Sequence, residues 1–143
     1  MPTTHNTPFA ADTLIEQWLA AFNAADLPAI CALYAPDARL WGTTAANLID
    51  SPAGVRAYFD RVFAMHPRPR MVLVERHGRG FGDVAVQSGR YDLELGPGRM
   101  LAARFTLVLR REIEPGDAAD TDNTNRSPWR IVEHHSSAVP DAP

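Results

Sequence analysis

The chain has 143 residues, the size of one ordinary domain, and its 45% hydrophobic and 22% charged residues are typical of a soluble globular protein. A net charge of -3 offers no basic surface for nucleic acid, so a nucleic-acid-binding protein is not expected. No stretch reaches the ~18 consecutive apolar residues of a membrane span, and the first residues lack the pattern of a signal peptide. We therefore expect a cytoplasmic protein without a membrane contact.

A first amphipathic helix is predicted after a flexible arm of residues 1–11. From Leu14 to Phe22 the apolar residues recur at steps of three and four, which is the spacing of one helix face. Asp12 precedes this run and is a suitable N-cap, because its carboxylate can accept a bond from a free amide of the first turn.

Two further helices and a short strand follow. Asp26 is predicted to cap a second helix that ends at Ala35, because the residue before a proline is pushed out of the helical region. Residues 38–43 are predicted to form a strand. Ser51 stands before a proline, a pair typical of a helix start, and this third helix should run to about Met65.

The second half of the chain changes to period two and β-branched residues, which is typical of strands. Strands are predicted at 70–77, 84–95, 100–111 and 129–137. Glycine-rich stretches at 78–83 and 96–99 are predicted to be turns, and the acidic, polar residues 112–127 a long mobile loop. The class is α+β, with three N-terminal helices on one face of an antiparallel sheet in a single domain over 12–140.

The order helix, helix, short strand, long helix and four long strands resembles the nuclear transport factor 2-like (SnoaL-like) superfamily. The phrases WLAAFNAADLPAICALYAPDARLWGT (18–43) and WRIVEHHSSAVP (129–140) carry the resemblance. Within the superfamily the chain is most similar to the association (hub) domain of calcium/calmodulin-dependent protein kinase II and its stand-alone bacterial relatives of the SgcJ/EcaC type. The resemblance implies a cone-shaped fold, a sheet curved around the long helix, a cavity at the wide end, and homodimers formed through the convex sheet face.

The same resemblance implies a site for a carboxylate-bearing ligand. Two arginines that line the hub cavity fall on Arg90 and Arg104 of this sequence. The hub histidine on the long helix falls on Val55, and a third hub arginine falls on Ser136. The chain thus departs from the hub pattern at these two positions.

The two arginines also point to an anion by their own chemistry. Arg90 and Arg104 each stand in the middle of an apolar strand, and a guanidinium withdrawn from water needs an acceptor for its donors. The acceptor could belong to the protein, the candidates being Asp92, Glu94 and Glu133. Alternatively, it is the carboxylate or phosphate of a ligand.

The pair of histidines near the chain end does not predict a metal site. His134 and His135 are adjacent in a strand and point to opposite faces, so they cannot both ligate one ion, and we expect neither a metal nor a cofactor. His134 and Ser136 share a face and are predicted to line the cavity, while His135 and Ser137 face outward. The alternative is that these groups only hydrogen-bond neighbouring strands.

The aromatic residues Tyr34, Trp41 and Tyr58 are candidates for apolar walls of the ligand site, although aromatic residues at such spacings are more often core. Ketosteroid isomerase, another member of the superfamily, needs a tyrosine and a carboxylate base. These fall on Trp18 and Gly42, so both working groups are missing at the matching positions.

Three functions remain open at this stage. The first is a homodimer that binds a small anionic organic molecule beside Arg90 and Arg104, with His134 and Ser136 at the cavity wall. The second is a SnoaL-like enzyme of the isomerase, cyclase or hydrolase type, in which His134 is the general acid or base. The third is a hub that assembles larger rings without catalysis.

Overall fold

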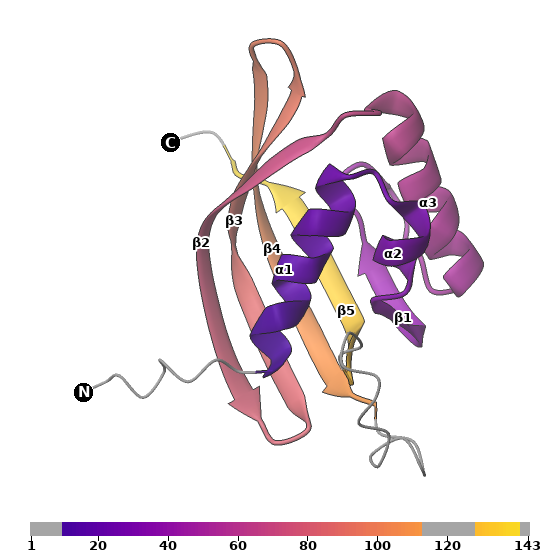
Figure 1. The fold of residues 1–143 in the computed structure, drawn as a ribbon, viewed down its shortest axis with the longest axis vertical. Coiled ribbons are helices and arrows are strands. Elements are labelled where there is room, and N and C mark those ends of the chain that lie inside the picture. Colours follow the sequence, from indigo (N-terminus) through magenta and orange to yellow (C-terminus); the bar gives the residue numbers. More distant parts are fainter. Residues whose placement is uncertain (1–9, 113–127, 141–143) are drawn as a thin grey trace.

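A computed structural model describes residues 10–112 and 128–140, which form three helices and one five-stranded sheet (Figure 1). The helices are α1 (Ala10–Asn23), α2 (Leu27–Cys31) and α3 (Pro52–Met65). The strands are β1 (Tyr34–Trp41), β2 (Arg70–Phe81), β3 (Val84–Gly96), β4 (Arg99–Arg111) and β5 (Trp129–Ala138). Most of the predicted arm and of the predicted 112–127 loop lies outside the described residues.

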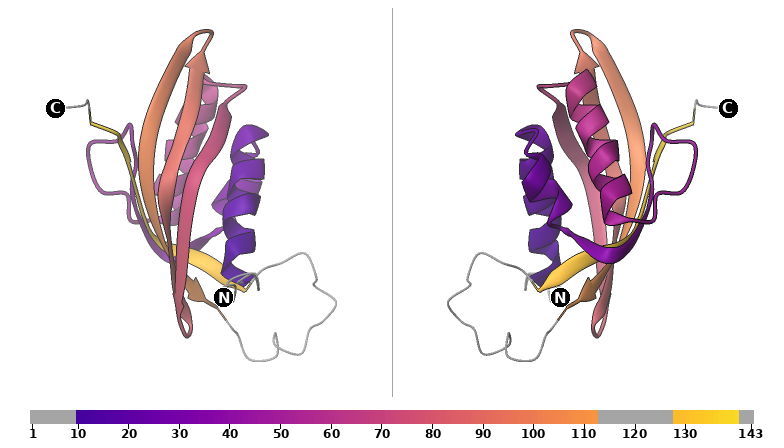
Figure 2. Two further views of the ribbon diagram at one scale, coloured as in Figure 1. Left: turned by 90° about the vertical axis from the view of Figure 1, so that its left-hand side faces the viewer. Right: turned by 90° about the vertical axis from the view of Figure 1, so that its right-hand side faces the viewer.

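The sheet has the strand order β1-β5-β4-β3-β2 and curves around the helices. Every neighbouring pair is antiparallel except β1 and β5, which run parallel at one edge. Figure 2 shows that α1 and α3 lie on the same, concave face. The predicted α+β class, with helices on one face of a curved sheet, is confirmed, and the parallel edge pair is a detail that the sequence did not reveal.

Helix α1 begins earlier than predicted. The chain is helical from Ala10, so Asp12 lies within the first turn instead of capping the helix. Its carboxylate has a different partner, because the Gln87 side chain on β3 donates a hydrogen bond of 2.6 Å from Nε2 to Asp12 Oδ1. The apolar face is as expected: Leu14 and Phe22 are buried against the sheet. The Asp12–Gln87 bond ties the start of α1 to the sheet.

The prediction that the second helix continues to Ala35 is wrong. Helix α2 ends at Cys31, and β1 begins at Tyr34, two residues before Pro36. The proline restricts only the residue before it, Ala35. The helix ends earlier because the backbone of this segment bonds to β5, where Ile131 N donates to Leu33 O at 2.8 Å. Pairing with β5 therefore overrides the helical pattern and places Tyr34 in the sheet.

Strand β2 is longer than predicted and includes most of the glycine-rich stretch. Only Gly82 and Asp83 form the turn before β3, and Gly82 has a φ of 71°, a conformation that favours glycine. Gly78 lies inside the strand, where a Cβ would be 2.7 Å from Nε2 of Gln87. This glycine therefore makes room for a buried side chain.

Helix α3 follows the prediction closely. The Ser51 hydroxyl accepts a bond of 3.0 Å from the Gly54 amide, Pro52 occupies the first turn, and the helix ends at Met65. Its buried side includes Tyr58 and Phe59, which face α1 and the sheet. None of the described helices is both long and apolar enough to cross a bilayer.

Candidate functional site

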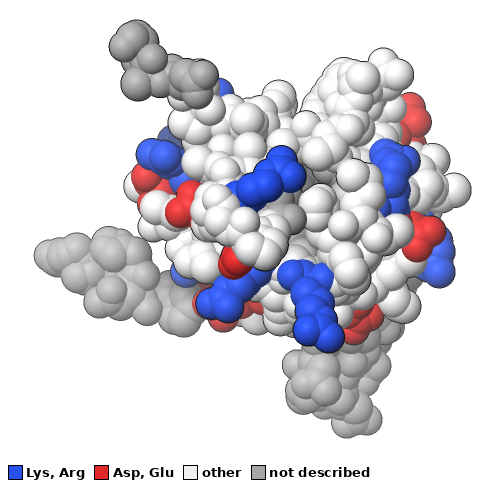
Figure 3. Space-filling model, turned by 90° about the horizontal axis from the view of Figure 1, so that it is seen from above, with Lys and Arg blue, Asp and Glu red and all other residues white. Residues whose placement is uncertain are grey.

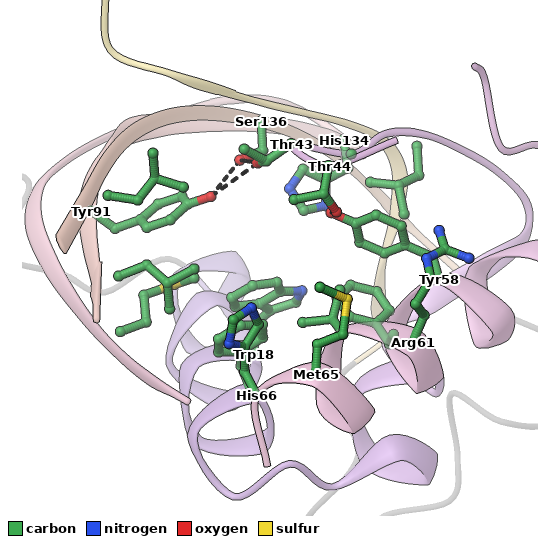
Figure 4. A pocket seen from close by; sticks show the side chains of 18 residues that line it. Trp18, Thr43, Thr44, Tyr58, Arg61, Met65, His66, Tyr91, His134 and Ser136 are labelled. Atoms are coloured by element: carbon green, nitrogen blue, oxygen red, sulfur yellow. Dashed lines mark hydrogen bonds between the residues drawn. The ribbon is translucent and has the colours of Figure 1, made fainter. Parts of the chain in front are cut away.

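A cavity of about 250 Å³ lies between the concave face of the sheet and the helices α1 and α3. It is close to the end of the molecule where α1 and α3 finish. Apolar and aromatic side chains form most of its wall, as Figure 4 shows. The lining residues are Trp18, Phe22, Leu40, Gly42, Thr43, Thr44, Tyr58, Phe59, Arg61, Val62, Met65, His66, Met71, Tyr91, Leu93, Leu101, His134 and Ser136.

Behind one wall of the cavity runs a chain of buried hydrogen bonds. Trp18 Nε1 on α1 donates to the Tyr34 hydroxyl on β1 at 3.0 Å. The same hydroxyl lies 2.8 Å from Nδ1 of His134 on β5. The His134 ring packs edge-on against Trp18, with centroids 5.9 Å apart, and is stacked on Tyr34 at 6.0 Å. Three elements that are distant in sequence thus fix one imidazole.

Burial controls the ionisation of this group. It lowers the pKa of His134 to about 3, with a smaller contribution from the charge of His135. Burial also raises the pKa of Tyr34 well above its usual value, although the bond from Trp18 partly opposes this change. His134 is therefore an uncharged imidazole at neutral pH.

Three hydroxyl groups meet on another part of the wall. Thr43 Oγ1 donates to Ser136 Oγ at 2.7 Å, and Ser136 Oγ shares a hydrogen bond of 2.5 Å with Tyr91 Oη (Figure 4). Burial raises the pKa of Tyr91, while its bonds to Ser136 and Thr43 partly oppose the shift. Ser136 is bonded to hydroxyls and not to His134, so the arrangement is not that of a serine nucleophile with its base.

A further hydroxyl comes from Tyr58 on α3. Thr44 Oγ1 donates to it at a long 3.5 Å. The guanidinium of Arg61, one helical turn along α3, lies 5.9 Å from the centroid of the same ring. Arg61 is the only arginine that lines the cavity among the described residues, and it is exposed.

The part of the wall near the end of α3 brings the cavity close to solvent. Met65 and His66 end the helix, and Met65 is 67% exposed. Seen from above, the basic side chains at this end of the molecule stand apart from one another among acidic ones, and they form no continuous patch of one sign (Figure 3). Of the described residues that line the cavity, Arg61 alone carries a guanidinium group.

The prediction that Arg90 and Arg104 line the cavity is wrong. The two residues are direct partners on β3 and β4, and both are exposed on the outer face of the sheet. Their strand neighbours Tyr91, Ala103 and Phe105 point inward and are buried, so alternation turns the arginines outward. The cost of burying a guanidinium, which motivated the anion site, does not arise.

The other candidate residues divide into three groups. His134 and Ser136 line the cavity and are each 6% exposed, as strand alternation predicts, whereas His135 faces outward. Tyr58 also lines it. Tyr34 does not line the cavity and instead lies behind His134. Trp41 is directed away from it and is 45% exposed.

Sequence reasoning missed several residues of the wall. Tyr91 could have been found, because it lies in the same strand as Arg90 with opposite orientation. Thr43 follows β1 and Arg61 lies on α3, and nothing in the local pattern distinguishes them from surface residues. In residues 10–112 and 128–140, no three His, Cys, Asp or Glu side chains come together as a group that could hold a metal ion.

Comparison with protein families decides the classification. The family model of the SnoaL-like domain matches residues 15–117, which is most of the chain. The chain belongs to the SnoaL-like domain family. This result agrees with the resemblance on which the sequence prediction rests. The match covers most of α1 and all of α2, β1, α3, β2, β3 and β4, and it ends before β5, the strand of His134 and Ser136.

Solved structures of similar SnoaL-like and NTF2-like proteins share the fold. A protein from Xanthomonas campestris named for the calcium/calmodulin-dependent protein kinase II association domain is 27% identical, with a TM-score of 0.73 over 92% of this chain and 87% of that one. An NTF2-like protein of unknown function from Pseudomonas putida is 22% identical, with a TM-score of 0.76 over 92% and 85%. The hub of this kinase from S. rosetta is 16% identical, with a TM-score of 0.73 over 91% and 95%. A search of curated proteins gave no match.

Proposed function

We propose that this SnoaL-like protein binds a small, largely apolar organic molecule in the cavity between α1, α3 and the concave face of the sheet. The observation that carries the proposal is the lining, in which aromatic and aliphatic side chains surround a few convergent polar groups. At about 250 Å³ the cavity is smaller than the roughly 300–1,000 Å³ of pockets for drug-sized molecules, so the ligand is a compact one.

The polar groups restrict where the ligand's own polar atoms lie. His134 and Tyr58 can meet one oxygen of the ligand, and the Thr43, Tyr91 and Ser136 hydroxyls another. Among the described residues that line the cavity, a negatively charged group would find one guanidinium, that of exposed Arg61. An anionic ligand therefore keeps its carboxylate near Arg61 and its apolar body inside.

Binding without turnover is the better supported of the two cavity functions. His134 is a poor general acid or base, because Nδ1 is bonded to Tyr34 and the pKa of the imidazole is about 3. Among the described residues that line the cavity, none is an aspartate or glutamate that could serve instead.

A thermal-shift experiment with matched compounds tests the proposal. We expect 1-tetralone and 1-naphthoate to raise the melting temperature, because both fit an apolar cavity of this size. Leu101→Trp should remove the effect by filling the cavity, whereas Met100→Trp, at a neighbouring side chain that is 59% exposed, should retain it. Arg61→Gln should reduce the shift caused by 1-naphthoate and leave that caused by 1-tetralone unchanged. Equal shifts in wild type and Leu101→Trp, or none in wild type, would contradict binding in this cavity.

Self-association through the outer sheet face is a second function that a specific observation favours. Val72 and Val74 on β2 are each 53% exposed there, and Trp41 on β1, at the opposite edge of the sheet, is 45% exposed. The similarity to the kinase hub supports the same idea. Sedimentation over a range of concentrations should show a dimer that Val74→Arg weakens and Met65→Arg, near the cavity, leaves intact. A monomer at every concentration would refute it.

A further inference from the structure

We propose that Trp18 and Tyr34 hold His134 as its Nε2–H tautomer, so that the cavity presents a fixed hydrogen-bond donor and selects ligands with an acceptor-only oxygen, such as a ketone or other carbonyl group. The ligand class rests on the function proposed above, whereas the tautomer does not. Trp18 and Tyr34 act here as positioning residues.

The direction of each bond follows from the donors available. An indole N–H can only donate, so Trp18 gives its proton to the Tyr34 oxygen at 3.0 Å. Tyr34 has one proton of its own, and the remaining partner of its hydroxyl is His134 Nδ1 at 2.8 Å. Tyr34 therefore donates to Nδ1, which must be unprotonated to accept, and the imidazole proton is on Nε2.

The opposite arrangement leaves a buried donor unsatisfied. If Nδ1 carried the proton, it would donate to an oxygen that already accepts from Trp18, and the Tyr34 proton would have no acceptor among the described residues. An unsatisfied buried donor has lost its bonds to water without a replacement. The Nε2–H tautomer should therefore be more populated than the Nδ1–H tautomer by roughly tenfold.

The Nε2–H group faces the cavity. The ring lines the cavity, and its orientation is fixed by stacking on Tyr34 and edge contact with Trp18. Within the described part of the chain, Nε2 has no hydrogen-bond acceptor, since the contact of His134 with Tyr34 uses Nδ1. Figure 4 shows the imidazole at the cavity wall beside the space that the aromatic residues enclose.

A neutral donor in an apolar surrounding favours ligand groups that accept a hydrogen bond over groups that only donate one. A carbonyl oxygen accepts from Nε2–H, and the imidazole is only 6% exposed, so an unmet donor there is costly. An ammonium or amide N–H in the same place would meet another donor. Because burial keeps the imidazole uncharged, the site has no full positive charge with which to attract a carboxylate at this point.

Nitrogen NMR of the histidine ring tests the tautomer without any ligand. In protein labelled with ¹⁵N-histidine at pH 7, the His134 signals, assigned by their loss in His134→Phe, should show an unprotonated Nδ1 and a protonated Nε2. Tyr34→Phe removes the donor to Nδ1 and should shift the population toward Nδ1–H. Tyr91→Phe deletes an equivalent hydroxyl elsewhere in the wall and should leave the signals unchanged. A protonated Nδ1 in wild type would overturn the proposal. This result does not depend on whether Tyr34→Phe folds.

A second measurement tests the ligand class. Tetralin has the same carbon skeleton as 1-tetralone but no oxygen. In Tyr34→Phe the affinity for the ketone should fall roughly three- to tenfold, the value of about one hydrogen bond, while that for tetralin stays the same. Equal losses for both compounds would overturn the selection for a carbonyl. A wild-type protein with the Nε2–H tautomer that binds neither compound would refute the proposed function and the ligand class but leave the tautomer standing.

Discussion

The phenol ring of Tyr58 occupies the space that a side chain at position 42 would need. A Cβ placed on Gly42 would lie 2.5 Å from Cε1 and Cζ of Tyr58 and 2.7 Å from its hydroxyl oxygen. The glycine is thus required by the close approach of α3 to the end of β1. It is also the position on which the sequence resemblance places the carboxylate base of ketosteroid isomerase.

Gly42→Ala should destabilise the protein by about 1–3 kcal/mol, the usual cost of overpacking a filled site. The added methyl group must displace the Tyr58 ring, which is buried and packs edge-on against Phe59 with centroids 5.1 Å apart. Urea unfolding monitored by circular dichroism measures the loss.

Two variants separate this clash from a general effect of replacing glycine. Gly96→Ala is the matched control, because a Cβ there meets nothing within 4 Å. Tyr58→Leu removes the two ring carbons and the hydroxyl oxygen involved, so Gly42→Ala should cost much less in that background. The same cost in both backgrounds would show that the tyrosine is not the cause.

Acid should destabilise the protein through His134. Its pKa is about 3 in the folded state, below the ordinary 6.5, so the unfolded chain binds the proton more readily between these values. The stabilisation is complete above pH 6.5 and is lost as the pH falls toward 3. From pH 6.5 to 5, before most carboxylates titrate, this single group should lower the free energy of unfolding by roughly 2 kcal/mol.

The variant His134→Phe should lack this part of the pH dependence, whatever its stability at pH 7. His135→Gln changes the exposed neighbour and should keep most of it, since the His135 charge is the smaller cause of the low pKa. Unfolding midpoints in urea at a series of pH values supply the comparison. Parallel curves for wild type and His134→Phe would mean that His134 does not carry the effect.

The Asn23 side chain should contribute about 1–2 kcal/mol by holding the end of α1 to the start of β2. Its Oδ1 accepts from the Met71 amide at 2.7 Å, and its Nδ2 donates to the Met71 carbonyl at 3.0 Å. Asn23→Ala removes both bonds, and Asn23→Asp keeps only the first, so thermal unfolding should rank wild type above Asp and Asp above Ala. An alanine variant as stable as wild type would contradict the role.

Local periodicity in the sequence predicts which face of a strand a side chain occupies. It does not predict which strands pair and in what register. Alternation along β5 correctly turned His134 and Ser136 to one face. Alternation along β4 also turns Arg104 outward, because Thr106 and Arg110 share its face and Phe105, Leu107 and Leu109 form the other. The wrong prediction for Arg104 followed from the family resemblance and not from this pattern.

The hydrogen-bonded chain behind the cavity shows the same limit. Trp18 and Tyr34 are 16 residues apart, and Tyr34 and His134 are 100 apart, so no local signal connects them. The sequence pattern moreover places Tyr34 in a helix, whereas pairing of β1 with β5 places it in the sheet. The fold class could be predicted, but the polar contacts of the site required the strand register.

Arg104→Glu should raise the free energy of unfolding of the monomeric protein. Arg90 and Arg104 are directly opposite each other on the outer face, and like charges in that position are unfavourable. Glu75, which pairs with Arg90 from the other side, is instead bonded to His77 at 2.8 Å. Replacing one arginine by glutamate turns repulsion into attraction, with an expected gain of about 0.2–1 kcal/mol at low salt.

Arg104→Gln is the control, because it removes the repulsion without adding an attraction and should gain less. Salt should reduce the difference between the two variants, since exposed charges are screened over about 10 Å at 0.1 M. Unfolding in urea at two protein concentrations completes the test. If Arg104→Glu lowers stability, and does so more at high protein concentration, the arginine pair meets acidic groups of a second copy and the outer face is an interface.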